Sequence, residues 1–377
     1  MSLSGITSLE KYADRFVSEI PHTPTGRYAS IILLRETKSY AIFTTEGGEQ
    51  QDVEQTQAGF QNGKRADRSV DRVVMFKRKQ IAPERRTGKA LLRQYDVFPY
   101  VILYSKDGQV TQVAYGQEEI AKAQEESKNK QGWELAGPYD DCYLTERLCT
   151  HCPDCLIYGY AAVEGEGARK ARVMTDSCFS VRDYTTVSER KNFNVIDEKD
   201  HTSGTITAYD YVKPDTVFPA VVTTVDLRLD EFVYVLSNVL RTQRYGKEVT
   251  RQGEMENHVL AVAFSDVELF ANLEFTQALY DALADDELDL AGGHIAVGEF
   301  LKRVPEVLKT LTANITGRLQ FLINGEILGL KEDEKLPDEW KVDLARVLKR
   351  VRELNQDETQ LATFLKELNR QSASFVI

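Results

Sequence analysis

Four of the five cysteines in this 377-residue chain lie in one short polar segment, where their side chains could hold a metal ion. The spacing is Cys142-x6-Cys149-x2-Cys152-x2-Cys155, and His151 lies directly before the third cysteine. Thiolates at two-residue gaps can surround one tetrahedral ion, whereas scattered cysteines are usually buried apolar residues. The spacing therefore predicts a structural zinc site with Cys149, Cys152 and Cys155 as ligands and Cys142 or His151 as the fourth.

Two other interpretations of the cysteine cluster stay open. Iron–sulfur proteins also use a Cys-x2-Cys-x2-Cys run, but the further Cys-Pro element of ferredoxins is missing here. The thiols can also pack without a metal. A zinc ion would hold together an insertion that lacks a core of its own. The fifth cysteine, Cys178, lies in an expected strand and is predicted to be a buried apolar residue.

The charge of the chain is distributed unevenly. The formal net charge is −12, yet residues 60–93 contain eleven Lys and Arg against three acids, and residues 241–251 contain four against one. Because these windows contribute +8 and +3, the rest of the chain carries −23. Such asymmetry is typical of a protein that binds a polyanion on one face and repels it elsewhere, although a solvated charged loop gives the same counts.

The composition is that of a soluble globular protein. Apolar residues make up 42% of the chain and charged residues 28%. No apolar run approaches the about 18 residues that a membrane span requires, and the N-terminal residues lack the apolar stretch of a signal peptide. We therefore expect a cytoplasmic protein without membrane association, in which reduced cysteines bind metal instead of forming disulfides.

Apolar periodicity predicts the elements that must position these residues. Strands are expected on either side of Arg35-Glu36-Thr37 and at 97–113, 171–181, 221–229 and 259–264. Helices are expected at 85–95, 117–130, 230–241 and 274–284, with a further apolar helical stripe at 344–354. Thr87 is the expected N-cap of the helix at 85–95, and the basic residues beside this helix start favour phosphate binding.

Two segments between these elements contain few core-forming residues. Residues 46–72 are predicted to form a long loop, and residues 184–218 an extended hairpin that projects from the body. Strands and helices interleave without the regular alternation of a doubly wound fold. The predicted class is therefore α+β, with a split core and insertions.

Three stretches of the sequence together resemble the Cas seven family of RAMP-type proteins, the backbone subunits of CRISPR interference complexes. The first, Arg85-Arg-Thr-Gly-Lys-Ala-Leu-Leu-Arg93, is similar to an early helix of that superfamily. The second consists of Cys152-Pro-Asp-Cys-Leu-Ile-Tyr-Gly159 and Lys170-Ala-Arg-Val-Met-Thr-Asp-Ser177. It is similar to a block of the superfamily in which C-x-x-C is followed by a glycine and by a strand that ends in Asp. The third looks specific to the type I-D branch and comprises Leu240-Arg-Thr-Gln-Arg-Tyr-Gly246, Thr250-Arg-Gln-Gly253, Asn257-His258 and Phe275-Thr-Gln-Ala-Leu-Tyr-Asp281.

The resemblance implies an RRM-like (ferredoxin-like) core that is discontinuous over residues 1–290. Its expected insertions are a basic lid loop at 46–84, a helix with a zinc-binding segment at 115–158 and a thumb-like hairpin at 188–214, and a helical region follows at 291–377. It also implies sequence-independent binding of a CRISPR guide RNA along which copies of the chain assemble. Further implied partners are target DNA, reached through the guide, and the other subunits of a type I-D complex.

Binding to a guide of variable sequence requires cations and backbone donors instead of base-edge contacts. The expected RNA-binding cations form two walls: Lys64, Arg65, Arg68, Arg85, Arg86 and Lys89, and opposite them Arg241, Arg244 and Arg251. Gly246 and Gly253 would allow close approach of the main chain to phosphate. Tyr245 and Phe60 are candidate stacking platforms.

Catalysis has little support in the sequence. No H-E-x-x-H, G-x-S-x-G or phosphate-cradling motif is present. Some relatives cut nucleic acid with a lone Asp in the early loop, which here would implicate Asp52 or Asp67, although isolated surface acids usually only solvate a loop. We therefore expect no enzyme activity, with two alternatives: a metal-dependent nuclease subunit, and a zinc-ribbon scaffold that binds only proteins through its acidic C-terminal helices.

Overall fold

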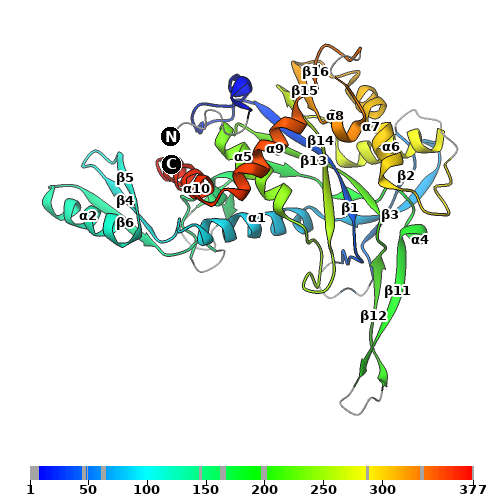
Figure 1. The fold of residues 1–377 in the computed structure, drawn as a ribbon. Helices are drawn as coiled ribbons and strands as arrows, with labels where there is room; N and C mark the ends of the chain where they lie inside the picture. The colour runs from blue at the N-terminus through cyan, green and yellow to red at the C-terminus, as the bar shows by residue number, and fades with distance from the viewer. Residues whose placement is uncertain are drawn as a thin grey trace.

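The structure is a computed structural model and describes residues 8–44, 48, 50–60, 65–143, 147–161, 167–196, 202–285, 288–331 and 335–375. It is a mixed α+β fold with several sheets, which confirms the predicted class. Figure 1 shows a central body from which two parts project in different directions. None of the helices in the described part of the chain has the length and apolar character that a membrane span requires.

The body is built on a six-stranded sheet in the order β16-β15-β14-β1-β13-β9. Its strands are β1 (Tyr28–Thr37), β9 (Val173–Thr175), β13 (Val217–Val225), β14 (Met255–Ser265), β15 (Leu319–Ile323) and β16 (Trp340–Lys341). Strand β1 lies between β13 and β14 and is antiparallel to both, so that Ile31 faces Val222 on one side and Val262 on the other. The predicted break at Arg35-Glu36-Thr37 is wrong, because β1 continues through these residues. Arg35 and Glu36 are buried and ion-paired, to Glu84 and Lys38 respectively.

Both faces of this sheet are covered by helices. Ile31 and Leu33 of β1 share a core cluster with helices α1 (Lys77–Gln94) and α5 (Leu229–Arg241). The alternate residues, Ile32 and Leu34, share a second cluster with α6 (Asn272–Asp285) and α7 (Val297–Thr312). Successive side chains of a strand point to opposite faces, and a strand covered on both faces therefore reads as a continuous apolar run.

Helix α1 begins eight residues before the predicted start. Phe76 is its N-cap residue, and Thr87 lies in its interior, so both the expected cap and the expected phosphate site at residue 85 are wrong. Pro83 lies inside the helix and suggests a boundary to sequence reasoning, because it lacks the N–H for an intrahelical hydrogen bond. Gly88 is needed for packing, since a Cβ there would collide with the side chains of Tyr234 and Asn238 on α5.

The predicted loop at 46–72 contains two strands. β2 (Val53–Gln57) and β3 (Ser69–Met75) form a three-stranded sheet with β10 (Cys178–Phe179), and β3 leads directly into α1. The valines of β3 are buried while Ser69 and Asp71 are exposed. Few large apolar residues are enough here, because none of the residues of β2 is buried and β3 is only seven residues long.

Two projections extend from the body (Figure 1). One is an arm of β4 (Tyr100–Tyr104), β5 (Val110–Tyr115) and β6 (Glu134–Tyr139) covered by α2 (Gly116–Asn129). The other is a long hairpin of β11 (Ser188–Ile196) and β12 (Thr202–Val212), which lies within the segment predicted to form one. It follows the short helix α4 (Tyr184–Val187), and Ala41 pairs with Val212 at its base.

The remaining elements belong to the same body. They are η1 (Glu10–Arg15), α3 (Pro153–Tyr158), β7 (Tyr160–Ala161), β8 (Ala168–Arg169), α8 (Gly325–Leu328), α9 (Leu344–Gln356) and α10 (Glu358–Ala373). The predicted stripe of α9 is confirmed, because its apolar residues are buried in the cluster that contains α1 and α5. The two C-terminal helices therefore extend the core on the α1 and α5 side of the sheet.

Candidate metal centre and nucleic-acid interface

The four clustered cysteines converge on one point beneath helix α1. The sulfur atoms of Cys142, Cys149, Cys152 and Cys155 all lie within 4.8 Å of one another, and all four residues are buried. Sγ of Cys155 lies 3.3 Å from that of Cys142 and 3.9 Å from that of Cys149. A tetrahedral zinc with Zn–S bonds of about 2.3 Å requires sulfur–sulfur separations of about 3.8 Å. The thiols are therefore arranged as a closed metal site.

Local backbone geometry explains this convergence. Cys152 is the N-cap residue of the short helix α3, which starts at Pro153 and places Cys155 in the first turn. The backbone N–H of Cys152 donates to Sγ of Cys149 over 3.3 Å. Hydrogen bonds from the other thiols, Cys149 foremost, lower the pKa of Cys142, whereas burial raises the pKa of Cys152. Because metal ligands are thiolates, an ion that binds all four sulfur atoms would displace the protons of the thiols whose pKa burial raises.

His151 lies beside the cluster. Its ring packs edge-on against Tyr139 at 5.5 Å between centroids, and burial lowers its pKa. In the described residues the four-member group of possible metal ligands contains Cys142 and omits His151. The geometry thus favours Cys142 as the fourth ligand.

Asp154 joins this cluster to helix α1. Its carboxylate is fully buried and receives two hydrogen bonds from Arg85, at 3.0 Å from Nε and 2.6 Å from Nη2. Nζ of Lys89 lies 3.2 Å from the same carboxylate and donates to the carbonyl oxygen of Cys142 over 3.0 Å. Burial lowers the pKa of Lys89, but Asp154 raises it overall. Two of the expected RNA-binding cations are thus largely buried and ion-paired, with side-chain exposures of 20% and 12%.

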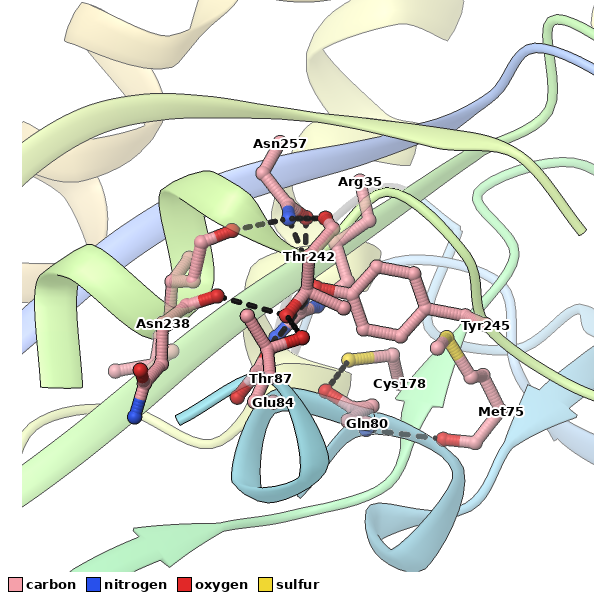
Figure 2. A network of polar contacts seen from close by, with 12 residues as sticks. Arg35, Met75, Gln80, Glu84, Thr87, Cys178, Asn238, Thr242, Tyr245 and Asn257 are labelled. Carbon is pink, nitrogen blue, oxygen red and sulfur yellow. Dashed lines mark hydrogen bonds and ion pairs between the residues drawn. The ribbon is translucent and has the colours of Figure 1, made fainter. Parts of the chain in front are cut away.

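A second buried network lies on the sheet side of α1 (Figure 2). Nη2 of Arg35 lies 2.8 Å from Glu84, and neither side chain is more than 1% exposed. The hydroxyl of Tyr245 accepts from Arg35 at 3.0 Å and from Asn257 at 2.8 Å, and donates to Glu84 at 3.1 Å. Tyr245 is fully buried, so the predicted base-stacking surface is not available on this residue.

The network holds the basic loop between α5 and β14 against the body. Thr242 at the start of the loop contacts Thr87 of α1 through their hydroxyls at 2.9 Å. Gly246 has φ +96°, and a Cβ there would lie 2.5 Å from the carbonyl oxygen of Ile42. Gly253 has φ +81°, and its Cβ would collide with the carbonyl oxygen of Tyr245. The two glycines therefore bring the loop close to the protein's own main chain.

Two arginines of the loop face solvent. Arg244 is exposed and donates to the carbonyl of Gln252 over 3.2 Å, and Arg251 is exposed as well. Lys247 lies over the ring of Tyr209, 4.7 Å from its centroid, at the base of the β11–β12 hairpin. The loop therefore presents its cations next to the point where the hairpin leaves the body.

The other predicted cations differ in their surroundings. Arg86 on α1 and Arg68, directly before β3, are exposed. Arg241 donates to the carbonyl of Asn355 over 3.0 Å. Arg65 pairs with two acids of α6, Asp281 at 3.4 Å and Asp285 at 2.9 Å. Lys64 lies outside the described residues.

Phe60 and the two candidate catalytic acids lie in or beside the β2–β3 hairpin. Phe60 is half-buried, and its N–H donates to Asp281. The backbone of Asp52 bonds to Phe43 and Val74, and Asp67 is exposed in a turn. Two groups of possible metal ligands occur in the described residues, the cysteines and Glu36 with Glu256 and His258, and neither contains Asp52 or Asp67. Lys38 already pairs with both Glu36 and Glu256 in the second group.

Sequence reasoning missed the acids that organise both sites. Asp154 lies between two predicted ligands, in the first turn of a helix, which is a signal that it could serve them. Glu84 is the only acid between Lys77 and Arg93. A single acid in so basic a helix is a signal for a buried ion pair. Its partners, Arg35 and Tyr245, cannot be identified from spacing in the sequence.

Comparisons with known proteins were made for sequence and for fold. The family described as Csc2 Crispr matches residues 15–336. The crystal structure of Thermofilum pendens Csc2 shares the fold, with a TM-score of 0.51 and 17% identity over 97% of each chain. Chains from two CRISPR RNA-guided surveillance complexes, the first described as pre-nicking, align at a TM-score of 0.44 with 13% and 11% identity, over 86% of this chain and 99% of theirs. No match to a curated protein was found. Since the family match spans most of the sequence, the chain belongs to the Csc2 Crispr family, as its resemblance to CRISPR backbone subunits predicts.

Proposed function

We propose that this protein binds a CRISPR guide RNA without sequence preference, as a repeated backbone subunit of a cytoplasmic type I-D interference complex. Copies of the chain would assemble along the guide and, with the other subunits, present it to target DNA. The observation that carries this proposal is the family match over residues 15–336.

The topology of the body supports an RRM-like core. Along the chain the central elements follow the order β1, α1, β9, β13, α5, β14, which is strand–helix–strand–strand–helix–strand. In space the four strands lie as β14-β1-β13-β9, with antiparallel pairing throughout. This is the arrangement of the split βαβ fold.

The loop between α5 and β14 is the proposed centre of the RNA-binding surface. Its exposed arginines, Arg244 and Arg251, are carried on a backbone that the buried network and two glycines hold in place. Arg86 extends the surface along α1, which the loop touches through Thr242 and Thr87. Guanidinium groups on a fixed backbone bind phosphates of any sequence, because no base edge is read.

The metal in the cysteine site is proposed to be zinc in a structural role. Four thiolates and no open coordination position are typical of structural zinc, and the site lies inside the main core cluster. No catalytic role is proposed for Asp52 or Asp67, since neither belongs to a group of possible metal ligands in the described residues.

Salt-dependent RNA binding by the purified protein tests the proposed function. Several unrelated single strands are compared at two salt concentrations, with wild type beside Arg244→Ala/Arg251→Ala. The logarithm of the affinity falls with that of the salt concentration by about 0.7 per phosphate contact on single strands, so the double variant is expected to reduce this slope by about 1.4. A matched control removes two exposed cations of α9, Lys349→Ala/Arg352→Ala, and is expected to leave the slope unchanged.

The outcomes separate the candidate functions. Similar affinities for all sequences, together with the reduced slope, support a guide-backbone subunit. Strong preference for one sequence contradicts it. Absence of RNA binding in both salts, alone and with assembled partner subunits, would instead support a scaffold that binds only proteins.

A further inference from the structure

We infer that Arg85, Lys89 and Asp154 are positioning residues of the cysteine metal centre, and that Arg85 and Lys89 do not contact RNA. The RNA half of this inference rests on the proposed function, whereas the metal half stands independently of it. Both cations lie in the most basic part of the sequence, and charge alone would assign them to the nucleic acid.

The geometry around Asp154 is that of a closed connection between two helices. Its carboxylate lies in α3, between the ligands Cys152 and Cys155, and is 0% exposed. Arg85 of α1 meets it with two parallel hydrogen bonds, which fixes both position and angle. The guanidinium also lies over the ring of Tyr158, one turn further along α3, 5.4 Å from its centroid. Arg85 therefore contacts both ends of α3 and has few donors left for a phosphate.

The charge of a loaded site gives these cations a function. Four thiolates around a zinc ion carry a net charge of about −2, and buried charge is costly unless it is compensated. Lys89 contributes a cation next to the cluster and donates to the carbonyl of the ligand Cys142. Asp154 holds that ammonium at 3.2 Å. Arg85 and Lys89 exceed Asp154 by one positive charge, which offsets part of the charge of the loaded site.

Three consecutive residues of α1 point in three directions. Glu84 enters the network with Arg35 and Tyr245, Arg85 meets Asp154, and Arg86 is exposed. Successive side chains of an α-helix are rotated by about 100° from one another, which accounts for this division. Of the basic residues at 85, 86 and 89, only Arg86 is therefore oriented towards solvent and assigned to RNA.

Metal retention of single-site variants tests this assignment. The variants Asp154→Asn, Lys89→Met and Arg86→Met are loaded with zinc, and transfer of the metal to a chromogenic chelator is followed. Loss of a partner that orients a metal ligand typically lowers metal affinity by about 10- to 100-fold. We expect losses of this order for Asp154→Asn and Lys89→Met, retention for Arg86→Met, and partial rescue by Lys89→Arg. Cobalt substitution reports whether a tetrathiolate site still forms.

RNA binding at saturating zinc completes the test. Arg86→Met is expected to reduce the salt slope by about 0.7, whereas Lys89→Met keeps the wild-type slope. Wild-type zinc transfer in both Asp154→Asn and Lys89→Met overturns the metal half. A reduced salt slope in zinc-loaded Lys89→Met overturns the assignment away from RNA. If Asp154→Asn does not fold, the zinc transfer rates of Lys89→Met and Lys89→Arg decide the metal half. If the wild type binds no RNA, the proposed function fails, but the metal measurements still test the metal half.

Discussion

Removal of the negative charge of Glu84 should destabilise this protein more than any other single isosteric change in the network of Figure 2. Glu84 is the carboxylate partner of Arg35, and both side chains are buried, at 1% and 0% exposure. Burial lowers the pKa of Arg35, but Glu84 raises it overall, so the guanidinium stays charged. Glu84→Gln keeps the shape of the side chain and creates no cavity. What it leaves behind is a buried cation without a counter-charge.

The expected cost follows from the position of this pair. Removing one partner of a buried ion pair typically costs about 3–5 kcal/mol. Tyr245→Phe is the matched control, because it removes only a hydroxyl. Each partner of that hydroxyl keeps another bond: Arg35 to Asn257 at 2.9 Å, Asn257 to the carbonyl of Val239 at 2.9 Å, and Glu84 to Arg35. The control should therefore cost only about 1 kcal/mol, the usual net value of one hydrogen bond.

Urea denaturation, followed by circular dichroism, measures both variants. The change in midpoint is converted to free energy with the wild-type slope, provided that the slope is shared. A double variant, Arg35→Met/Glu84→Met, should be less destabilised than Glu84→Gln, because it buries no charge. If Glu84→Gln costs no more than Tyr245→Phe, the argument that Glu84 compensates the buried guanidinium is refuted.

Three further predictions concern the metal, a glycine and an N-terminal contact. Metal analysis of freshly purified protein should find about one equivalent of zinc per chain, and clearly substoichiometric metal would contradict the proposed site. Gly88→Ala should destabilise the fold by about 1–3 kcal/mol and so lower the melting temperature, because its Cβ would collide with Tyr234 and Asn238. This cost should exceed the gain from the better helix propensity of Ala, and a raised melting temperature would contradict this packing. Burial raises the pKa of Asp226, but hydrogen bonds from Thr25, Arg27 and Gly26 lower it overall. The ionised carboxylate therefore stabilises the folded protein above the unfolded pKa of about 3.9, and this stabilisation is lost as the pH falls through the lower folded pKa. Asp226→Asn should therefore be less stable than wild type at pH 7, and the difference should shrink on acidification; a constant difference would contradict it.

Local sequence patterns predicted several helices and part of the cysteine site. Helix α5 was predicted within one residue because its apolar stripe is dense, and α9 followed from its apolar stripe in the same way. Helix α2 was predicted as a polar helix. The cysteine spacing predicted the convergence of Cys149, Cys152 and Cys155, since two-residue gaps leave them little freedom, and it left Cys142 or His151 open as the fourth member. In each of these correct predictions, the residues that decide the structure lie close together in the sequence.

The errors arose where distant residues decide the structure. Helix α1 was started too late because Thr87 was expected to be its N-cap, yet the helix begins at Lys77 and packs in one core cluster with α3 and α5. Tyr245 was assigned to stacking because it lies among arginines, yet its hydroxyl meets Arg35, which lies 210 residues away in the sequence. Strands β2 and β3 were missed because β2 has no buried residue and β3 pairs with β10, which lies about 100 residues further along the chain. Contacts of this kind have no signature in local spacing.

The three-way division of Glu84, Arg85 and Arg86 also restricts how the length of this chain can change. One residue inserted or deleted between Lys77 and Glu84 would rotate the following part of α1 by about 100° relative to the part before it. A deletion would then bring Arg85 to the position that faces Arg35, and an insertion would bring Pro83 there. In both cases Glu84 would lose its contact with Arg35. Substitutions at the exposed positions of this stretch are tolerable, but a change in its length is not. Among natural variants of this protein, insertions and deletions should therefore fall outside residues 77–89, however varied the exposed residues within them are.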